Sequence, residues 1–169
     1  MKTAATSYYD IDSPIGRIRL IAKNGKLTQV LLLGDPAWKE SPGARIDNPK
    51  SVPAISAATD FLKRYFAGEK VSWVGKSIPA GTEFQNKVWR ATAAIPFGVT
   101  VSYGELAARI GRSGAARAVG MGMKRNPLPI LVPCHRVIGA DGGLCGYGGK
   151  KPAGLKLKRR LLRHEGVEI

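Results

Sequence analysis

The sequence predicts a two-domain protein of mixed class, α/β plus mainly α. We expect a small amino-terminal antiparallel sheet with one covering helix, followed by a winged-helix-like helix-turn-helix domain. Two observations support this expectation: strand-like patterns are confined to the start of the chain, and capped, helix-spaced segments dominate after residue 81. A glycine-bounded segment, residues 75–81, lies between the two regions. The expected domains are therefore residues 1–80 and 81–169.

Short strands are expected over residues 8–33. Residues 16–21 partly alternate between polar and apolar side chains, and residues 27–33 are rich in leucine and β-branched residues. The dipeptide Asn24-Gly25 between them is a strong signal for a two-residue hairpin, because such turns favour residues that tolerate positive φ. This region therefore predicts the small antiparallel sheet.

One amphipathic helix is expected to cover that sheet. After a connection rich in proline and glycine, residues 34–49, apolar side chains recur with helical spacing over residues 52–66. Pro53 suits the first helical turn, where the N–H group that proline lacks has no helical partner.

The second region opens with a helix over residues 83–94. Thr82 is a candidate N-cap, and residues 96–98, Pro-Phe-Gly, would end the helix. Phe84 and Val88 lie on its apolar face.

A helix-turn-helix is expected next. Ser102 can cap a helix over residues 103–110, the glycines of residues 111–114 make a tight break, and residues 115–125 form another helix. Small residues dominate this second helix, in which Ala116, Ala118 and Gly120 surround Arg117. Glycine inside a helix costs roughly 1 kcal/mol, so a close approach is implied, either to a groove or to another helix.

The carboxy-terminal domain also carries the candidate active-site cysteine. Cys134 is followed directly by His135, so a soft nucleophile has a base as its neighbour. A free thiol is mostly protonated near neutrality, and His135, Arg136 and Lys124 could supply the base and the positive field that generate thiolate. The alternative is a buried structural cysteine beside a surface histidine.

The flanking sequence suggests where this pair lies. Residues 128–132 are apolar and residues 139–149 are glycine-rich, so we expect a sharp turn between strand-like pieces.

The charge balance favours a polyanionic partner. The chain has 27 Lys and Arg against 12 Asp and Glu, a net charge of +15, which would attract nucleic acid. Increased solubility or a generally basic proteome is the alternative reading.

Targeting and redox signals favour a cytoplasmic protein. The first nine residues do not resemble a signal peptide, and no apolar run approaches the roughly 18 residues of a membrane span. Cys134 and Cys145 do not form a disulfide framework, and with two histidines no zinc-finger spacing occurs. We expect no metal, no cofactor and no membrane partner.

Ordered sequence blocks carry a family resemblance. They are VSYGELA at 101–107, ARAVG at 116–120, NP at 126–127, PCHRVIG at 133–139, GY at 146–147 and LLRHEG at 161–166. From residue 81 to 166 the chain thus resembles the O6-alkylguanine-DNA alkyltransferases, or methylated-DNA–protein-cysteine methyltransferases, of the stand-alone type. The first 80 residues resemble the family's amino-terminal α/β domain in pattern.

The resemblance implies a single-turnover DNA repair protein. It would move an alkyl group from O6 of guanine, and less readily O4 of thymine, to its own cysteine, Cys134. His135 matches the base that acts through a bridging water, and Glu165 matches the carboxylate that orients it. Tyr103 matches a residue that crowds the target phosphate and donates to guanine N3, and Asn126 matches one that bridges helix-turn-helix and active-site loop.

The same resemblance implies contacts with double-stranded DNA that carries alkylated bases. The target base would leave the stack, with Arg117 in its place and the second helix of the helix-turn-helix in the minor groove. The implied DNA-binding residues are Arg117, Ala116, Ala118, Gly120, Tyr103 and Arg136, and the implied pocket residues are Val137, Tyr147 and Gly148. A monomer is expected, with cooperative assembly on DNA left open.

The chain departs from the family pattern at residues 150–153, which read as an insertion before the last helix, and at Cys145. The cysteine-rich zinc domain of the regulator relatives has no counterpart here. Two other classes remain open: a lesion sensor, whose known relatives lack the cysteine, and a transcription factor, whose recognition helix should present long polar side chains.

Overall fold

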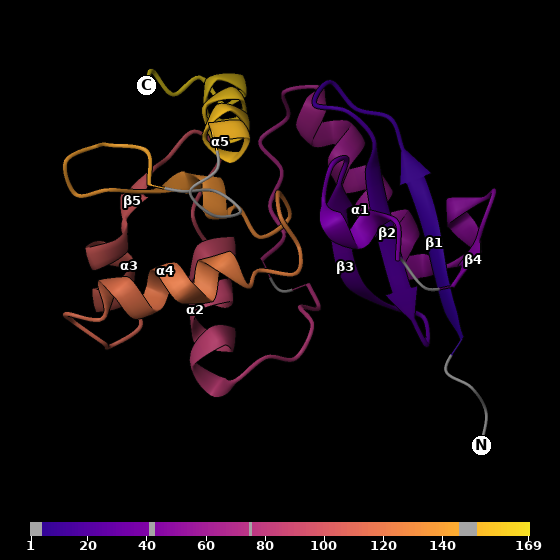
Figure 1. The fold of residues 1–169 in the computed structure, drawn as a ribbon, viewed down its shortest axis with the longest axis horizontal. Helices are drawn as coiled ribbons and strands as arrows, with labels where there is room; N and C mark the ends of the chain where they lie inside the picture. The colour runs from indigo at the N-terminus through magenta and orange to yellow at the C-terminus, as the bar shows by residue number, and fades with distance from the viewer. Residues whose placement is uncertain (1–4, 41–42, 75, 146–151) are drawn as a thin grey trace.

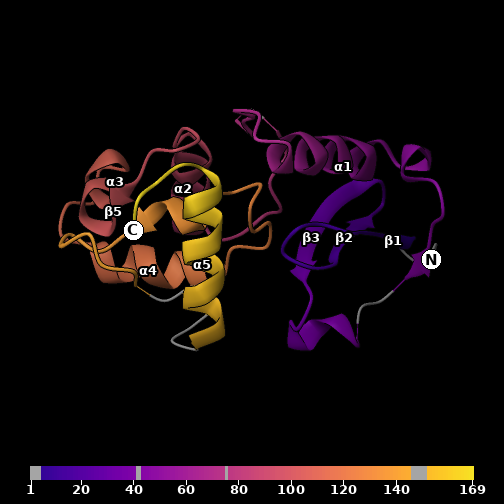
Figure 2. The same cartoon turned by 90° about the horizontal axis from the view of Figure 1, so that it is seen from above.

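The computed structural model describes residues 5–40, 43–74, 76–145 and 152–169, which form two lobes side by side (Figures 1 and 2). The amino-terminal lobe contains the strands β1 to β4 and the helix α1. The carboxy-terminal lobe contains the helices α2 to α5. In the described residues, no helix is both long and apolar enough to cross a membrane.

The amino-terminal sheet has the strand order β3-β2-β1-β4. Its strands β1 (Thr6–Ile11), β2 (Ile18–Lys23) and β3 (Lys26–Leu32) are antiparallel neighbours, as predicted. Asn24 and Gly25 join β2 to β3 with φ values of 51° and 74°, the positive values that a tight hairpin turn needs.

The sheet is antiparallel over β1 to β3, as expected, but it also has a fourth strand that the sequence does not predict. β4 (Ala44–Arg45) pairs in parallel with β1. The chain leaves β3, forms the short 3-10 helix η1 (Pro36–Trp38) and reaches the opposite edge of the sheet, so it enters β4 in the direction of β1. A strand of two residues within a Pro- and Gly-rich connection has no periodicity from which to predict it.

One helix, α1 (Pro53–Phe66), covers the sheet (Figure 2). It follows the short 3-10 helix η2 (Pro49–Ser51) and begins at the proline expected in its first turn. Each large apolar side chain buried on its inner face contributes roughly 1.5–3 kcal/mol, so this face fixes the helix on the strands. The buried residues are Ile55, Ala58, Thr59, Phe61, Leu62 and Tyr65.

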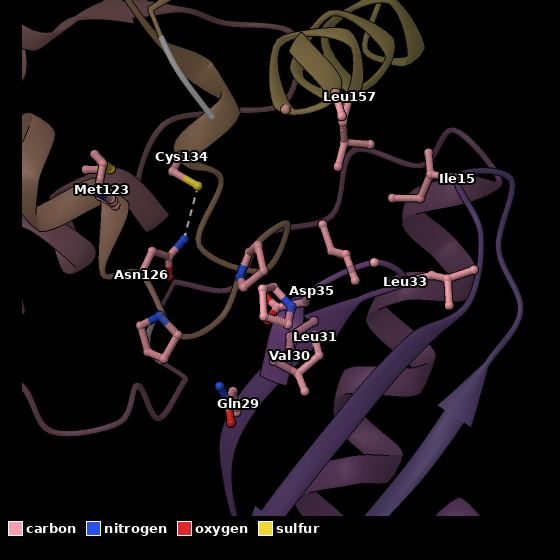
Figure 3. A pocket seen from close by; sticks show the side chains of 18 of the residues that line it. Ile15, Gln29, Val30, Leu31, Leu33, Asp35, Met123, Asn126, Cys134 and Leu157 are labelled. Carbon is pink, nitrogen blue, oxygen red and sulfur yellow. Dashed lines mark hydrogen bonds between the residues drawn. The ribbon is translucent and has the colours of Figure 1, made fainter. Parts of the chain in front are cut away.

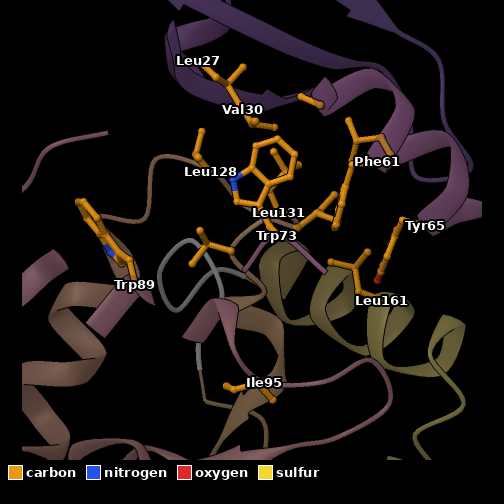
Figure 4. Packing of buried hydrophobic residues seen from close by; sticks show 14 of the residues in the cluster. Leu27, Val30, Phe61, Tyr65, Trp73, Trp89, Ile95, Leu128, Leu131 and Leu161 are labelled. Carbon is orange, nitrogen blue, oxygen red and sulfur yellow. The ribbon is translucent and has the colours of Figure 1, made fainter. Parts of the chain in front are cut away.

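A continuous hydrophobic cluster joins the two lobes. Figure 4 shows Val30 of β3 and Phe61 of α1 around Trp73, with Leu131 of the other lobe beside them. The backbone N–H of Val30 also donates to the carbonyl of Pro127 over 2.8 Å. The lobes are therefore docked through buried apolar surface; the boundary at residue 80 remains a prediction.

The carboxy-terminal lobe is helical, as expected. Its helices are α2 (Glu83–Ala93), α3 (Tyr103–Arg109), α4 (Ala116–Lys124) and α5 (Pro152–His164). α3 and α4 form the predicted helix-turn-helix, and α5 lies on the side that faces the amino-terminal lobe (Figures 1 and 2).

Local signals in the sequence set the helix boundaries. Thr82 and Gln85 form a capping box at the start of α2, and Ser102 and Glu105 form another at the start of α3. Within the break between α3 and α4, Gly111 and Gly114 have φ values of 70° and 85°, which glycine adopts without strain. Both predicted caps are confirmed.

The cysteine lies at a turn, but only one of the expected strand-like flanks exists. Cys134 begins the 3-10 helix η3 (Cys134–Arg136), which leads into β6 (Val137–Ile138), and β6 pairs in parallel with β5 (Val101–Ser102). The apolar run at residues 128–132 is a turn with one isolated bridge, not a strand. Pro129 within it cannot donate a ladder hydrogen bond, which disfavours a strand there.

Candidate active site

Asn126 fixes the turn that presents the cysteine. Its side-chain Nδ2 donates to the carbonyl of Val132 over 2.8 Å, and its Oδ1 accepts from the N–H of Leu128 over 3.0 Å. The same Nδ2 lies 3.2 Å from Sγ of Cys134, close enough to donate a hydrogen bond to sulfur (Figure 3). The structure thus brings Asn126 and Cys134 together, and a donor at this distance favours the thiolate.

The turn is also strained. Ile130 is fully buried and has φ of 75°, a backbone conformation that a β-branched residue rarely adopts. Such a residue costs of order 1–3 kcal/mol and persists where its surroundings hold it, here the Asn126 bonds on either side.

His135 and Glu165 form a buried pair. Nε2 of His135 lies 2.5 Å from Oε1 of Glu165, and neither side chain is exposed. Burial lowers the pKa of His135, and Arg136 and Lys158 lower it further, although Glu165 opposes them. The imidazole is therefore neutral near pH 7 and available as a base.

Glu165 accepts hydrogen bonds from several groups. Oε2 accepts from Nε of Arg136 and from the N–H of Gly98, each over 2.9 Å. Burial would raise the pKa of this carboxyl, but the bonds to His135 and Arg136 outweigh it and lower the pKa to about 2. The carboxylate stays ionised and keeps the imidazole oriented.

The structure contradicts the expected DNA contact of Arg136. Its side chain is 3% exposed, and its guanidinium donates to Glu165 and to the carbonyl of Ile95. A guanidinium matches a carboxylate through paired N–H groups, and these bonds hold Arg136 in the interior, away from any phosphate.

Sequence reasoning missed Tyr65 of α1. Its hydroxyl donates to Oε1 of Glu165 over 2.8 Å, so the amino-terminal lobe reaches the His135–Glu165 pair. A helix-spaced tyrosine in the sequence indicates only a core position, and its partner is 100 residues away.

Sequence reasoning also missed Lys158 of α5. Its side chain is fully buried, and Nζ donates to the carbonyls of Val137 and Cys145 over 2.5 and 3.0 Å. Burial lowers its pKa, while charge on Cys134 or Cys145 would raise it. A buried lysine in a helix otherwise rich in exposed basic residues gives no sequence signal of its own.

A cleft of about 540 Å³ between the lobes gives access to Cys134, which is only partly buried (Figure 3). One wall comes from residues 29–36 at the end of β3, and the other from Met123, Asn126 and Pro127. Leu157 of α5 also lines it. The thiol can therefore meet a ligand from outside.

The helix-turn-helix presents a surface of the expected kind. Arg117 and Ala118 are exposed, whereas Ala116 and Gly120 are half-buried. The interpretation of close helix packing holds for Gly122, where an added Cβ would lie 3.4 Å from Val88. The exposed Ala118 remains available to a groove.

Tyr103, the first residue of α3, packs its ring beside Gly120 of α4. A Cβ added at Gly120 would lie 3.7 Å from its ring, and Nζ of Lys158 lies 5.8 Å from the ring centroid. Burial raises the pKa of Tyr103 to about 12, so its phenol is a hydrogen-bond donor at neutral pH.

The expected pocket residues are only partly placed. Val137 is fully buried in β6, so its side chain does not face the cleft. Tyr147 and Gly148 lie outside the described residues. So do Lys150 and Lys151 of the presumed insertion, whereas Pro152 and Ala153 form the first turn of α5 rather than a loop. Cys145 is exposed, and its backbone carbonyl accepts from Lys158.

Comparison with known proteins agrees with this geometry. Residues 83–167 match the family model of the 6-O-methylguanine DNA methyltransferase DNA-binding domain. The methylated-DNA–protein-cysteine methyltransferase of Mycobacterium bovis is 45% identical over 164 residues, covering 94% of this chain and 91% of its own. The constitutive enzyme of Bacillus subtilis is 39% identical, covering 95% of each chain.

Solved structures agree in fold as well. The crystal structure of Mycobacterium tuberculosis OGT in complex with DNA superposes with a TM-score of 0.79 at 43% identity, covering 94% of this chain and 92% of that one. Both lobes fall within the matched length. By sequence and by structure, the chain belongs to the methylated-DNA–protein-cysteine methyltransferase family.

Proposed function

We propose that this protein repairs alkylated DNA by direct reversal. It transfers the alkyl group from O6 of guanine, and less readily from O4 of thymine, to Cys134, once per molecule. The observation that carries this proposal is the arrangement of Cys134. The Asn126 amide lies 3.2 Å from its sulfur, and the next residue in the chain is His135, which pairs with the buried Glu165. The names of the relatives support it.

The chemical step is a displacement at the alkyl carbon. The Cys134 proton passes to His135 through a bridging water, and the thiolate attacks the carbon. A carbon–sulfur bond forms as the carbon–oxygen bond breaks, and the electron pair of that bond stays on the guanine, which then takes up a proton. The products are S-alkylcysteine and unmodified guanine, so no cofactor is consumed.

The orientation of His135 supports its role as the base. Because Nε2 bonds to the Glu165 carboxylate, the neutral ring carries its proton there and has its lone pair on Nδ1. Nδ1 has no hydrogen-bond partner within the described parts of the chain. It can therefore accept the thiol proton, and Glu165 then stabilises the imidazolium that forms.

Double-stranded DNA is the proposed partner. A thiol recessed in a cleft reaches O6 only if the base leaves the stack, so Arg117 would fill the vacated space while Ala118 lets α4 approach the minor groove. Tyr103, as a protonated phenol, would donate to guanine N3. The net charge of +15 supplies sequence-independent attraction to phosphates. We expect the protein to be a monomer and to act in the cytoplasm, where a reactive thiol stays reduced.

The rival functions fit the site less well. A lesion sensor would need neither Cys134 nor the donors around it. A transcription factor would present long polar side chains where α4 exposes Ala118.

Transfer of a labelled methyl group tests the proposal. After incubation with a duplex that contains labelled O6-methylguanine, the wild-type protein should retain the label on Cys134. Cys134→Ser should bind the duplex with similar affinity and retain no label, because a hydroxyl is a far weaker nucleophile under the same base. A label found on Cys145, with Cys134 unmodified, would contradict the proposal.

A further inference from the structure

Tyr65 belongs to the amino-terminal lobe, yet its side chain contacts Glu165 and lies near His135 in the active site. Its hydroxyl donates to Oε1 of Glu165 over 2.8 Å and lies 3.5 Å from Nε2 of His135. The side chain is completely buried (Figure 4). Its backbone carbonyl lies 2.8 Å from Nε2 of His164, the last residue of α5. Tyr65 therefore contacts both His164 and Glu165, the residue that follows this helix.

The phenol of Tyr65 stays protonated and donates to Glu165. Burial and the neighbouring Glu165 raise the pKa of Tyr65 far above its ordinary value, so the hydroxyl keeps its proton at any working pH. Oε1 of Glu165 therefore accepts from three groups: the imidazole of His135 over 2.5 Å, the phenol of Tyr65 over 2.8 Å and Nη2 of Arg136 over 3.1 Å.

We propose that Tyr65 is a positioning residue for alkyl transfer. Its hydroxyl holds Oε1 of Glu165 in line with His135, so a residue of the amino-terminal lobe helps to orient the base that deprotonates Cys134. This inference rests on the proposed function. It assigns to the amino-terminal lobe a part in the chemistry, through a residue that touches neither the alkyl group nor the thiol.

The hydroxyl also limits how strongly Glu165 attracts the proton on His135. Four side chains bear on this proton: Glu165 favours it, Arg136 and Lys158 disfavour it, and Tyr65 shares the oxygen that would stabilise it. Without the phenol, more of the carboxylate charge acts on the imidazole. His135 would then hold a proton to a higher pH, and a protonated histidine cannot accept the proton of the thiol.

Tyr65→Phe isolates the hydroxyl from the ring. The phenyl ring can keep the stacking on Phe61 and the edge contacts with Phe66 and Phe97. Thr59→Val is a matched control, because Thr59 lies on the same helix and its buried hydroxyl has no hydrogen-bond partner in the described part of the structure. Both changes remove one buried hydroxyl from α1 and preserve side-chain shape.

The first measurement is the rate of transfer against pH with free O6-benzylguanine, a substrate that needs no DNA binding. Tyr65→Phe should react about tenfold more slowly near pH 7, as expected for one hydrogen bond to a charged group. The acidic limb of its profile should move to higher pH. Thr59→Val should match the wild type in both respects, and both variants should bind duplex DNA like the wild type.

The second measurement does not depend on transfer. The proton between His135 and Glu165 in a short, charge-assisted hydrogen bond should give a strongly downfield proton resonance in the unreacted protein. Tyr65→Phe should shift this resonance, and Thr59→Val should not.

The outcomes separate this inference from the proposed function. A Tyr65→Phe protein with the wild-type rate, acidic limb and imidazole resonance would overturn the inference and leave the function intact. A slower rate that is accompanied by a lower melting temperature, with the limb and resonance unmoved, would also overturn it, since the role would then be structural. A wild-type protein that accepts no alkyl group would overturn the proposed function and this inference with it.

Discussion

The side-chain amide of Asn126 donates to Sγ of Cys134 over 3.2 Å while it holds the carbonyl of Val132 over 2.8 Å. One residue thus shapes the turn and places a donor on the nucleophile. The two residues lie eight positions apart in the sequence, and the strained turn at Ile130 brings their side chains together.

Asn126→Ala should lower both the rate of transfer and the reactivity of the thiol. Loss of the donor destabilises the thiolate, so Cys134 should need a higher pH to react with iodoacetamide, and transfer from free O6-benzylguanine should fall about tenfold or more. The pH dependence of alkylation, followed by mass spectrometry, checks this. An alanine variant whose thiol reacts like that of the wild type would show that the amide only shapes the turn.

Lys158→Met should weaken the site without removing its apolar packing. The buried ammonium interacts electrostatically with Cys134 and donates to the carbonyls of Val137 and Cys145, so its loss should slow transfer and loosen the segment between these two residues. Arg159→Met, an exposed neighbour on α5, is the control and should react normally. Rates with free O6-benzylguanine and amide hydrogen exchange of residues 137–145 test both effects. Equal rates for the two variants would show that Lys158 does not assist transfer.

Arg117→Ala should slow repair in duplex DNA much more than reaction with free O6-benzylguanine. Arg117 is exposed on α4 and would act on base extrusion, which the free base does not require. The ratio of the two rates is the measurement. A similar loss on both substrates would place Arg117 in the chemistry instead.

The free energy of unfolding should fall as the pH falls below about 6.5. The pKa of Glu165 is about 2 in the folded protein and 4.5 ordinarily, so its ionised form stabilises the fold above pH 4.5 by about 3 kcal/mol, and this is lost as the pH falls towards 2. His135, whose folded pKa is lowered by burial, adds stability that is present above 6.5 and is lost at lower pH.

Urea unfolding at several pH values measures this dependence. Glu165→Gln should be less stable near neutrality and should show a flatter profile between pH 5 and pH 2. A wild-type protein of constant stability from pH 7 to pH 3 would contradict the pKa shifts described for the pair.

The features that the sequence predicts correctly are formed by residues that lie close together in the chain. The caps at Thr82 and Ser102, the turn at Asn24-Gly25 and the adjacency of Cys134 and His135 are local, so the sequence contains them. The contacts that a sequence cannot show join distant elements.

Tyr65 and Arg136 illustrate this limit. Tyr65 reaches Glu165 across 100 positions, and helical periodicity indicates only that such a residue is buried. The family resemblance implies a DNA contact for Arg136, yet the buried Glu165 carboxylate requires a guanidinium and holds this one in the interior. Composition gives the sign of a charge but not the direction in which its side chain points.

The central claim is that Cys134 receives the alkyl group and leaves guanine intact. The most direct measurement is a titration of the protein with a duplex that carries one O6-methylguanine, read out by peptide mass mapping of the protein and nucleoside analysis of the DNA. We expect one methyl group per chain, located on Cys134, and one restored guanine for each. Turnover beyond one methyl group per chain, a free methylated base, or a methyl group on any other residue would contradict it.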